Sequence, residues 1–93
     1  MTFEWDERKN RIKKAKHAVS FEQAAKVWKD PKRIVFYDEK HSSDEERWNV
    51  LGVSGTVLFV VFVEKTVETV RLISARKANN EESKRYYRDY DIG

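Results

Sequence analysis

The chain has 93 residues, which is enough for one domain with a single hydrophobic core and too few for two. Charged residues make up 38% of the chain and the formal net charge is +3, so we expect an ionic surface suited to a polyanion or an acidic protein partner. The absence of cysteine excludes disulfides, thiolate nucleophiles and thiol metal sites, and the longest apolar run, Val57 to Val63, is too short to cross a membrane. We therefore expect a single cytoplasmic domain over residues 1–93 that does not contact membranes.

The N-terminal segment predicts a short strand followed by a basic helix. Phe3 and Trp5 alternate with polar residues, as in an extended segment. Asp6 can cap the helix that follows, and Glu7 in its first turn complements the helix dipole. The helix has only a narrow apolar stripe, so its Lys and Arg stems should partly cover apolar neighbours.

A second helix has the clearest signals in the sequence. Ser20 and Gln23 match a capping box, and the apolar residues that follow share one face at helical spacing up to Trp28. Asp30 and Pro31 should end this helix, because proline restricts the residue before it and cannot continue the hydrogen-bond ladder.

From residue 34 onward the apolar period changes to two, which predicts four strands. They cover residues 34–37, 47–53, 56–63 and 67–75, with an acidic connection over 38–46 and turns at 54–55 and 64–66. Alternation places Arg47 and Arg71 on the face opposite to Trp48 and Leu72. If the helices cover the Trp48 face, both arginines project from the open one.

A terminal helix should begin at the cap pattern of Asn79 with Glu82. The predicted fold class is therefore α+β. We expect a small, mostly antiparallel sheet of four main strands plus a short N-terminal strand, with two N-terminal helices and one C-terminal helix.

Three arginines are candidates for binding a phosphate. Cleavage of RNA needs a base near the 2′-hydroxyl, cations on the scissile phosphate and a proton donor for the leaving oxygen. Arg47, Arg71 and Arg76 suit the second role, because a guanidinium binds phosphate oxygens in two places and stays charged. The structural alternative is that each arginine pairs with a surface carboxylate.

The candidates for proton transfer are His17, His41 and Glu46. Of these, only the two histidines titrate near neutral pH when unperturbed. In the structural alternative His17 compensates a helix dipole and His41 orients its acidic loop. The acids of that loop lack metal-site spacing, so we expect no metal ion and no other cofactor.

Lys16, Lys77 and Tyr86 are candidates for contacting RNA outside the catalytic groups. Tyr86 can stack on a base, although tyrosines on a terminal helix more often serve packing.

Short motifs along nearly the whole chain occur in the order of a known family. They are Phe3-Glu4-Trp5-Asp6 with Lys9, Lys16-His17, Val19-Ser20-Phe21-Glu22 with Ala24, Asp30-Pro31, His41-Ser42 with Glu45-Glu46-Arg47-Trp48, Gly52, and Ile73-Ser74-Ala75-Arg76-Lys77-Ala78 with Glu82 and Tyr86. In this order they resemble the BrnT family of toxins from bacterial type II toxin–antitoxin modules. Each piece alone is weak evidence, whereas the ordered set is specific.

This resemblance implies a RelE-like fold and a metal-independent endoribonuclease that halts growth by cutting RNA. It also implies a cognate BrnA-type antitoxin, a ribbon-helix-helix protein that neutralises the toxin, in a complex of two toxins and two antitoxins. Operator DNA would be bound only through the antitoxin.

The chain departs from the family pattern at three places. Lys13 stands where asparagine is usual, Ala18 replaces a customary glycine, and Glu64-Lys65 occupies a position where arginine is common. The first two departures flank His17, so reduced activity is one expectation. An alternative function is therefore an inactive binding module that acts with its antitoxin as a DNA-bound operon repressor. A third is an RNA-binding protein without catalysis.

Overall fold

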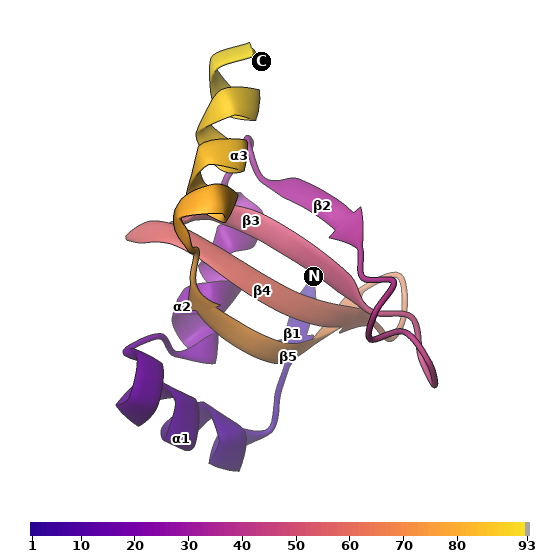
Figure 1. Ribbon diagram of the computed structural model, residues 1–93. Helices are drawn as coiled ribbons and strands as arrows, with labels where there is room; N and C mark the ends of the chain where they lie inside the picture. The colour runs from indigo at the N-terminus through magenta and orange to yellow at the C-terminus, as the bar shows by residue number, and fades with distance from the viewer. Residues whose placement is uncertain (93) are drawn as a thin grey trace.

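The computed structural model describes the backbone of residues 1–92 and the side chains of these residues except Lys13 and 89–92. Within this range a five-stranded mixed sheet has the strand order β1-β5-β4-β3-β2 (Figure 1). Its strands are β1 Thr2–Glu4, β2 Ile34–Tyr37, β3 Trp48–Ser54, β4 Thr56–Glu64 and β5 Thr69–Lys77. β1 pairs parallel with β5, and the other pairings are antiparallel. The predicted α+β class is confirmed.

The helices of the described chain are α1 Glu7–His17, α2 Phe21–Ala25, the 3-10 turn η1 Lys26–Lys29 and α3 Asn80–Ile92. The second predicted helix thus ends earlier than expected as an α-helix and continues as η1. The backbone N–H of Asp30 donates to the carbonyl of Val27 at 3.0 Å, and such tightening is common in the last turn of a helix.

Three predicted helix caps are present. Asp6 Oδ1 accepts from the backbone N–H groups of Arg8 and Lys9 at 3.0 and 3.2 Å. Ser20 Oγ accepts from the Gln23 N–H at 3.1 Å. At the start of α3, Asn79 Oδ1 accepts from the Glu82 N–H at 2.8 Å, and Glu82 Oε1 accepts from the Asn79 N–H at 2.9 Å. These caps satisfy backbone donors that the helices leave unpaired.

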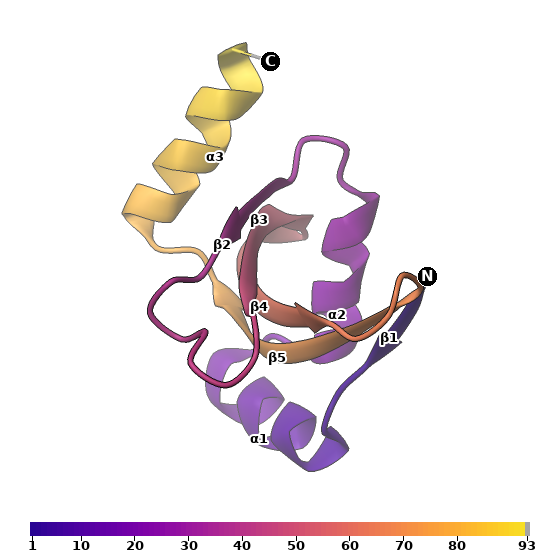
Figure 2. The ribbon, with the colours of Figure 1, turned by 90° about the vertical axis from the view of Figure 1, so that its right-hand side faces the viewer.

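One face of the sheet carries the main core. Phe21, Ala24 and Val27 of α2 and η1 pack on Val60 and Leu72 of the sheet. Figure 2 shows α2 on this side of the sheet, with α3 and the 38–47 connection on the other. We call the second side the open face. α3 covers part of it, where Leu51 of β3, Val57 of β4 and Tyr86 of α3 form a smaller apolar cluster.

A register shift in β5 changes which side chains reach the open face. Val61 pairs with Ser74 and Phe62 pairs with Leu72, so Ile73 is an extra residue on β5. Such a bulge interrupts strict alternation. Arg71 and Arg76 are five residues apart and would otherwise point to opposite faces, but the bulge brings both to the open face.

Candidate functional site

A cavity of about 270 Å³ lies on the open face where several elements meet. Its lining side chains come from α1, the 38–47 connection and strands β4 and β5: Lys9, Asp38, His41, Arg47, Val61, Ile73 and Ser74. We call it the His41 pocket. It combines a histidine, a carboxylate, a hydroxyl and two cations, which is the set of groups needed to bind a phosphate and transfer a proton beside it.

Asp38 fixes the orientation of His41. The ring Nδ1 of His41 lies 3.2 and 3.1 Å from the two carboxylate oxygens of Asp38, and the backbone N–H of His41 also donates to Asp38 Oδ1 at 3.3 Å. The carboxylate is largely covered, with a side-chain exposure of 11%, whereas the His41 side chain is 65% exposed. An Nδ1–H donated to Asp38 leaves Nε2 as the basic nitrogen of the neutral ring, available to a ligand.

Arg47 supplies an uncompensated charge to the same pocket. Among the described residues no carboxylate forms an ion pair with it, and its Nε is buried without a hydrogen-bond partner. Its backbone is held by the Ser42 hydroxyl, which accepts from the Arg47 N–H at 2.9 Å and donates to the Asp38 carbonyl at 2.5 Å. Ser42 therefore joins both ends of the loop that carries His41.

Lys9 closes the pocket from α1. Its Nζ donates to the carbonyl of Ile73 at 3.3 Å, at the bulge of β5. The bulge thus provides an acceptor that keeps the ammonium group at the rim of the pocket, and it places Ser74 beside Val61 on the floor.

Arg71 lies in the same cross-strand row as Arg47. Val63 of β4 pairs with Arg71 of β5. On the other side of β4, Phe62 pairs with Trp48, so Arg47, one residue earlier, lies opposite Val63. Two strand spacings put the Cα atoms of the two arginines about 10 Å apart. Arg71 forms a long ion pair with Glu4 at 3.9 Å, with both side chains nearly half exposed, and such pairs are weak.

Arg76 is on the open face but is already paired. Its Nη1 and Nη2 donate to the two carboxylate oxygens of Glu82 at 2.7 and 2.9 Å, and its Cζ lies 4.4 Å from the centre of the Phe59 ring. The hydrogen bonds raise the pKa of Arg76 and lower that of Glu82. Glu82 largely neutralises this guanidinium.

The remaining predicted site residues lie outside the His41 pocket. His17 ends α1, about 12 Å along the helix axis from Lys9, and Lys16 beside it is exposed in the same last turn. Glu46 lines a separate cavity with Trp48 and Val63. Lys77 is exposed at the end of β5.

Tyr86 does not have the accessible ring that stacking on RNA requires. Only 2% of the residue is exposed, and its hydroxyl donates to Asp30 Oδ2 at 2.5 Å. The ring instead packs in the smaller apolar cluster and ties α3 to the segment after η1.

Lys9, Asp38 and Ser74 line the pocket without having been predicted as site residues. Asp38 stands three residues before His41, but that spacing predicts a contact only if the connection turns there. Lys9 and Ser74 belong to motifs of the family resemblance, and that was the one signal in the sequence that singled them out.

Two further findings concern the described part of the chain. No helix in residues 1–92 is long and apolar enough to cross a membrane. Among the side chains that are described, no group of three or more His, Cys, Asp or Glu residues is placed to hold a metal ion.

Comparison with known proteins adds two matches. The model of a family described as ribonuclease toxin, BrnT, of type II toxin-antitoxin system matches residues 5–82. Among solved structures, the crystal structure of the Brucella abortus ribonuclease toxin, BrnT, is 25% identical in sequence and has a TM-score of 0.67. That match covers 86% of this chain and 99% of the other. No curated protein matches the chain.

Proposed function

The chain belongs to the BrnT family of ribonuclease toxins of type II toxin–antitoxin systems, and we propose that it cleaves RNA internally, without a metal ion, at the His41 pocket. The observation that carries this proposal is the placement of His41, oriented by Asp38, in one pocket with the uncompensated Arg47. The BrnT structure matched above is also that of a ribonuclease toxin.

The proposed reaction is attack of a ribose 2′-oxygen on the adjacent phosphorus. Nε2 of His41 accepts the 2′-hydroxyl proton, and the Asp38 carboxylate stabilises the imidazolium that forms. The bond from phosphorus to the 5′-oxygen breaks, that oxygen takes up a proton from water, and the His41 imidazolium returns its proton to the solvent. The products are a 2′,3′-cyclic phosphate and a free 5′-hydroxyl.

The cations of the pocket would stabilise the charge that develops on the phosphoryl oxygens. Arg47 is the principal candidate, because no carboxylate among the described side chains pairs with its guanidinium. Lys9 lies at the same pocket, and Arg71 in the row of Arg47 is placed to bind the RNA backbone further along the sheet. His17 and Glu46 have no part in this proposal.

The type II family implies an antitoxin partner. We propose a BrnA-type ribbon-helix-helix antitoxin in a 2:2 complex that reaches operator DNA through the antitoxin alone, and a cytoplasmic toxin that inhibits growth by cutting RNA. We also propose that the fold is RelE-like. An inactive binding module would keep the antitoxin complex but would not cleave RNA.

The proposal is tested with antitoxin-free protein and a 5′-labelled RNA in the presence of EDTA. Wild type should cleave, while His41→Ala and Arg47→Gln should each lose about 10²- to 10⁴-fold in rate. Arg11→Gln is the matched control, since it removes one charge from an exposed site on α1. Loss of wild-type cleavage in EDTA would contradict the metal-free mechanism, and RNA binding without cleavage would favour the non-catalytic alternatives.

A further inference from the structure

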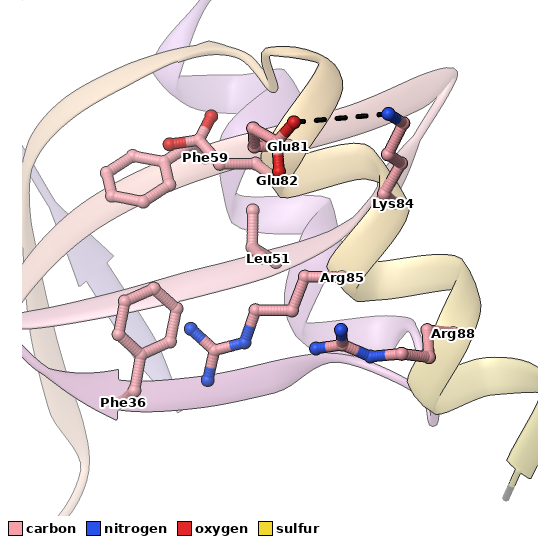
Figure 3. A pocket seen from close by; sticks show the side chains of 8 residues that line it. All are labelled: Phe36, Leu51, Phe59, Glu81, Glu82, Lys84, Arg85 and Arg88. Carbon is pink, nitrogen blue, oxygen red and sulfur yellow. Dashed lines mark ion pairs between the residues drawn. The ribbon is translucent and has the colours of Figure 1, made fainter.

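A second cavity on the open face, of about 490 Å³, lies between α3 and the sheet (Figure 3). Phe36 and Phe59 form an aromatic floor on either side of Leu51, and Arg85 reaches from α3 toward the Phe36 ring. The two rings are 6.2 Å apart between centres. The rings are inclined to each other by 63°, so each offers its own aromatic face, and an aromatic face beside a cationic wall suits a ligand with a planar ring and an anionic group.

This cavity continues the floor of the His41 pocket. On β4, Phe59 lines the cavity and Val61 lines the pocket, two residues apart on one face and therefore about 7 Å from each other. Leu51 on β3 and Arg47, one residue before that strand, also share the face; they are four residues apart, with Asn49 between them. A strand of RNA with a phosphate at Arg47 would thus have a neighbouring nucleotide over the aromatic floor.

Arg85 shows that the Phe36 ring accepts a flat cationic group. Its Cζ lies 4.2 Å from the ring centre, and among the described side chains no carboxylate pairs with it. The two acids at the cavity are already paired, since Glu82 binds Arg76 and Glu81 lies 3.9 Å from Lys84. The charge of Arg85 is therefore available to a phosphate.

Asn49 adds a polar group that lacks a partner. It is 6% exposed, and its Oδ1 has no hydrogen-bond partner among the described residues. It stands in the cross-strand row from Phe36 to Val61, which places it between the two cavities on the open face. A side-chain amide carries both donors and an acceptor, as the edge of a base does.

We propose that this cavity is a nucleotide subsite for the residue next to the scissile phosphate, an inference that rests on the proposed ribonuclease function. The base stacks on Phe36 in place of Arg85, the guanidinium moves to the phosphate of that nucleotide, and Asn49 contacts the edge of the base. A nucleotide is favoured over an antitoxin segment because the floor is continuous with the His41 pocket.

The test is the binding of two uncleavable probes at fixed salt, measured by fluorescence anisotropy. One is an adenosine hexamer with methylated 2′-hydroxyls, and the other is the same backbone without bases. Wild type should prefer the first about tenfold, as expected for stacking of one base. Phe36→Leu should remove most of this preference, and Phe36→Tyr should restore it.

Arg85→Gln provides a second test that removes no core packing. It should weaken both probes and lower the slope of log affinity against log salt by about one. Arg11→Gln, with the same loss of charge outside both cavities, should keep the preference for bases. Thermal unfolding shows whether each variant is folded.

The outcomes separate the two proposals. A folded Phe36→Leu protein with the wild-type preference for bases would overturn the subsite. So would Phe36→Leu and Arg85→Gln proteins that bind both probes as wild type does and lose only affinity for the antitoxin. His41→Ala should lose cleavage and keep the preference for bases. A wild type that prefers bases but does not cleave would overturn the proposed function and leave the subsite supported.

Discussion

Glu82 on α3 binds Arg76 on β5 through two hydrogen bonds of 2.7 and 2.9 Å, one from each terminal guanidinium nitrogen. The same carboxylate accepts from the backbone N–H of Asn79 and so also caps the helix. One side chain therefore starts α3 and fastens it to the sheet. This relationship gives Arg76 a role in holding α3 in place.

Arg76→Ala should accordingly act mainly on stability. The substitution removes both hydrogen bonds to Glu82. Because the Arg76 side chain is nearly half exposed, the free energy of unfolding should fall by only about 1–2 kcal/mol. Glu82→Gln should have a similar effect, because the neutral amide cannot form the charged pair. Urea unfolding measures both. RNA cleavage by folded Arg76→Ala should fall far less than by Arg47→Gln, and an equal fall would show that Arg76 acts directly on RNA.

Acid should destabilise the fold through Glu82 and Asp30. The hydrogen bonds from Arg76 lower the pKa of Glu82. Burial by itself would raise the pKa of Asp30, but hydrogen bonds from Tyr86, Val53 and Lys32 outweigh it and lower the pKa. Both pKa values are lower folded than unfolded, so the stabilisation is complete above the unfolded value of about 4 and is lost as pH falls through the folded values.

Urea unfolding at several pH values tests this prediction. Wild-type stability should be constant above about pH 5 and should decrease below about pH 4. Tyr86→Phe removes the hydroxyl that donates to Asp30, which should cost about 1 kcal/mol at neutral pH and make the acid loss shallower. A Tyr86→Phe protein with the wild-type acid profile would show that this hydrogen bond does not lower the pKa of Asp30.

The sequence predicted the elements well because their signals are local. The caps at Asp6, Ser20 and Asn79 each depend on residues at most three positions away. The bulge at Ile73 has no such local signal, since it is defined by the partner strand. Strict alternation placed Arg71 on the open face correctly, but it would put Arg76 on the opposite face, because Arg76 reaches the open face only through the bulge.

The candidate site was only partly predictable for the same reason. His41 and Arg47 are close in sequence, and the Ser42 hydroxyl keeps the two ends of their loop together. His17 has the same chemistry as His41, and only the packing of α1 beside β5 separates it from the pocket. Lys9 comes to the pocket through a contact with Ile73, 64 residues away.

Gly52→Ala should be strongly destabilising, because β3 passes directly beneath η1. A Cβ at this position would overlap Cγ1 of the fully buried Val27 and would lie 3.3 Å from Arg33 Cβ. Overpacking of this kind costs about 1–3 kcal/mol. Val27→Ala makes room, so the double variant should lose less free energy of unfolding than the sum of the two single losses. Additive losses would show that the two side chains do not compete for one space.

Ala18→Gly should stabilise the protein. Ala18 has a left-handed backbone with φ of 58°, and its N–H donates to the Lys14 carbonyl at the end of α1 at 2.9 Å. Glycine adopts this conformation without the Cβ penalty, so the gain should be about 0.5–1 kcal/mol. Ala15→Gly, inside the same helix, is the matched control and should lose about 1 kcal/mol. Thermal unfolding distinguishes the two directions, and a loss in both variants would contradict the argument from backbone conformation.

Asp38→Asn should reduce RNA cleavage through His41 alone. The carboxylate contacts Nδ1 of the ring and not Nε2, the proposed base, so it orients the imidazole. We expect cleavage to fall at least about tenfold, because the ring loses the anionic partner that orients it. In the His41→Ala background the same substitution should have almost no further effect, since the two residues act as a unit. Independent losses in the double variant would place Asp38 in direct contact with RNA instead.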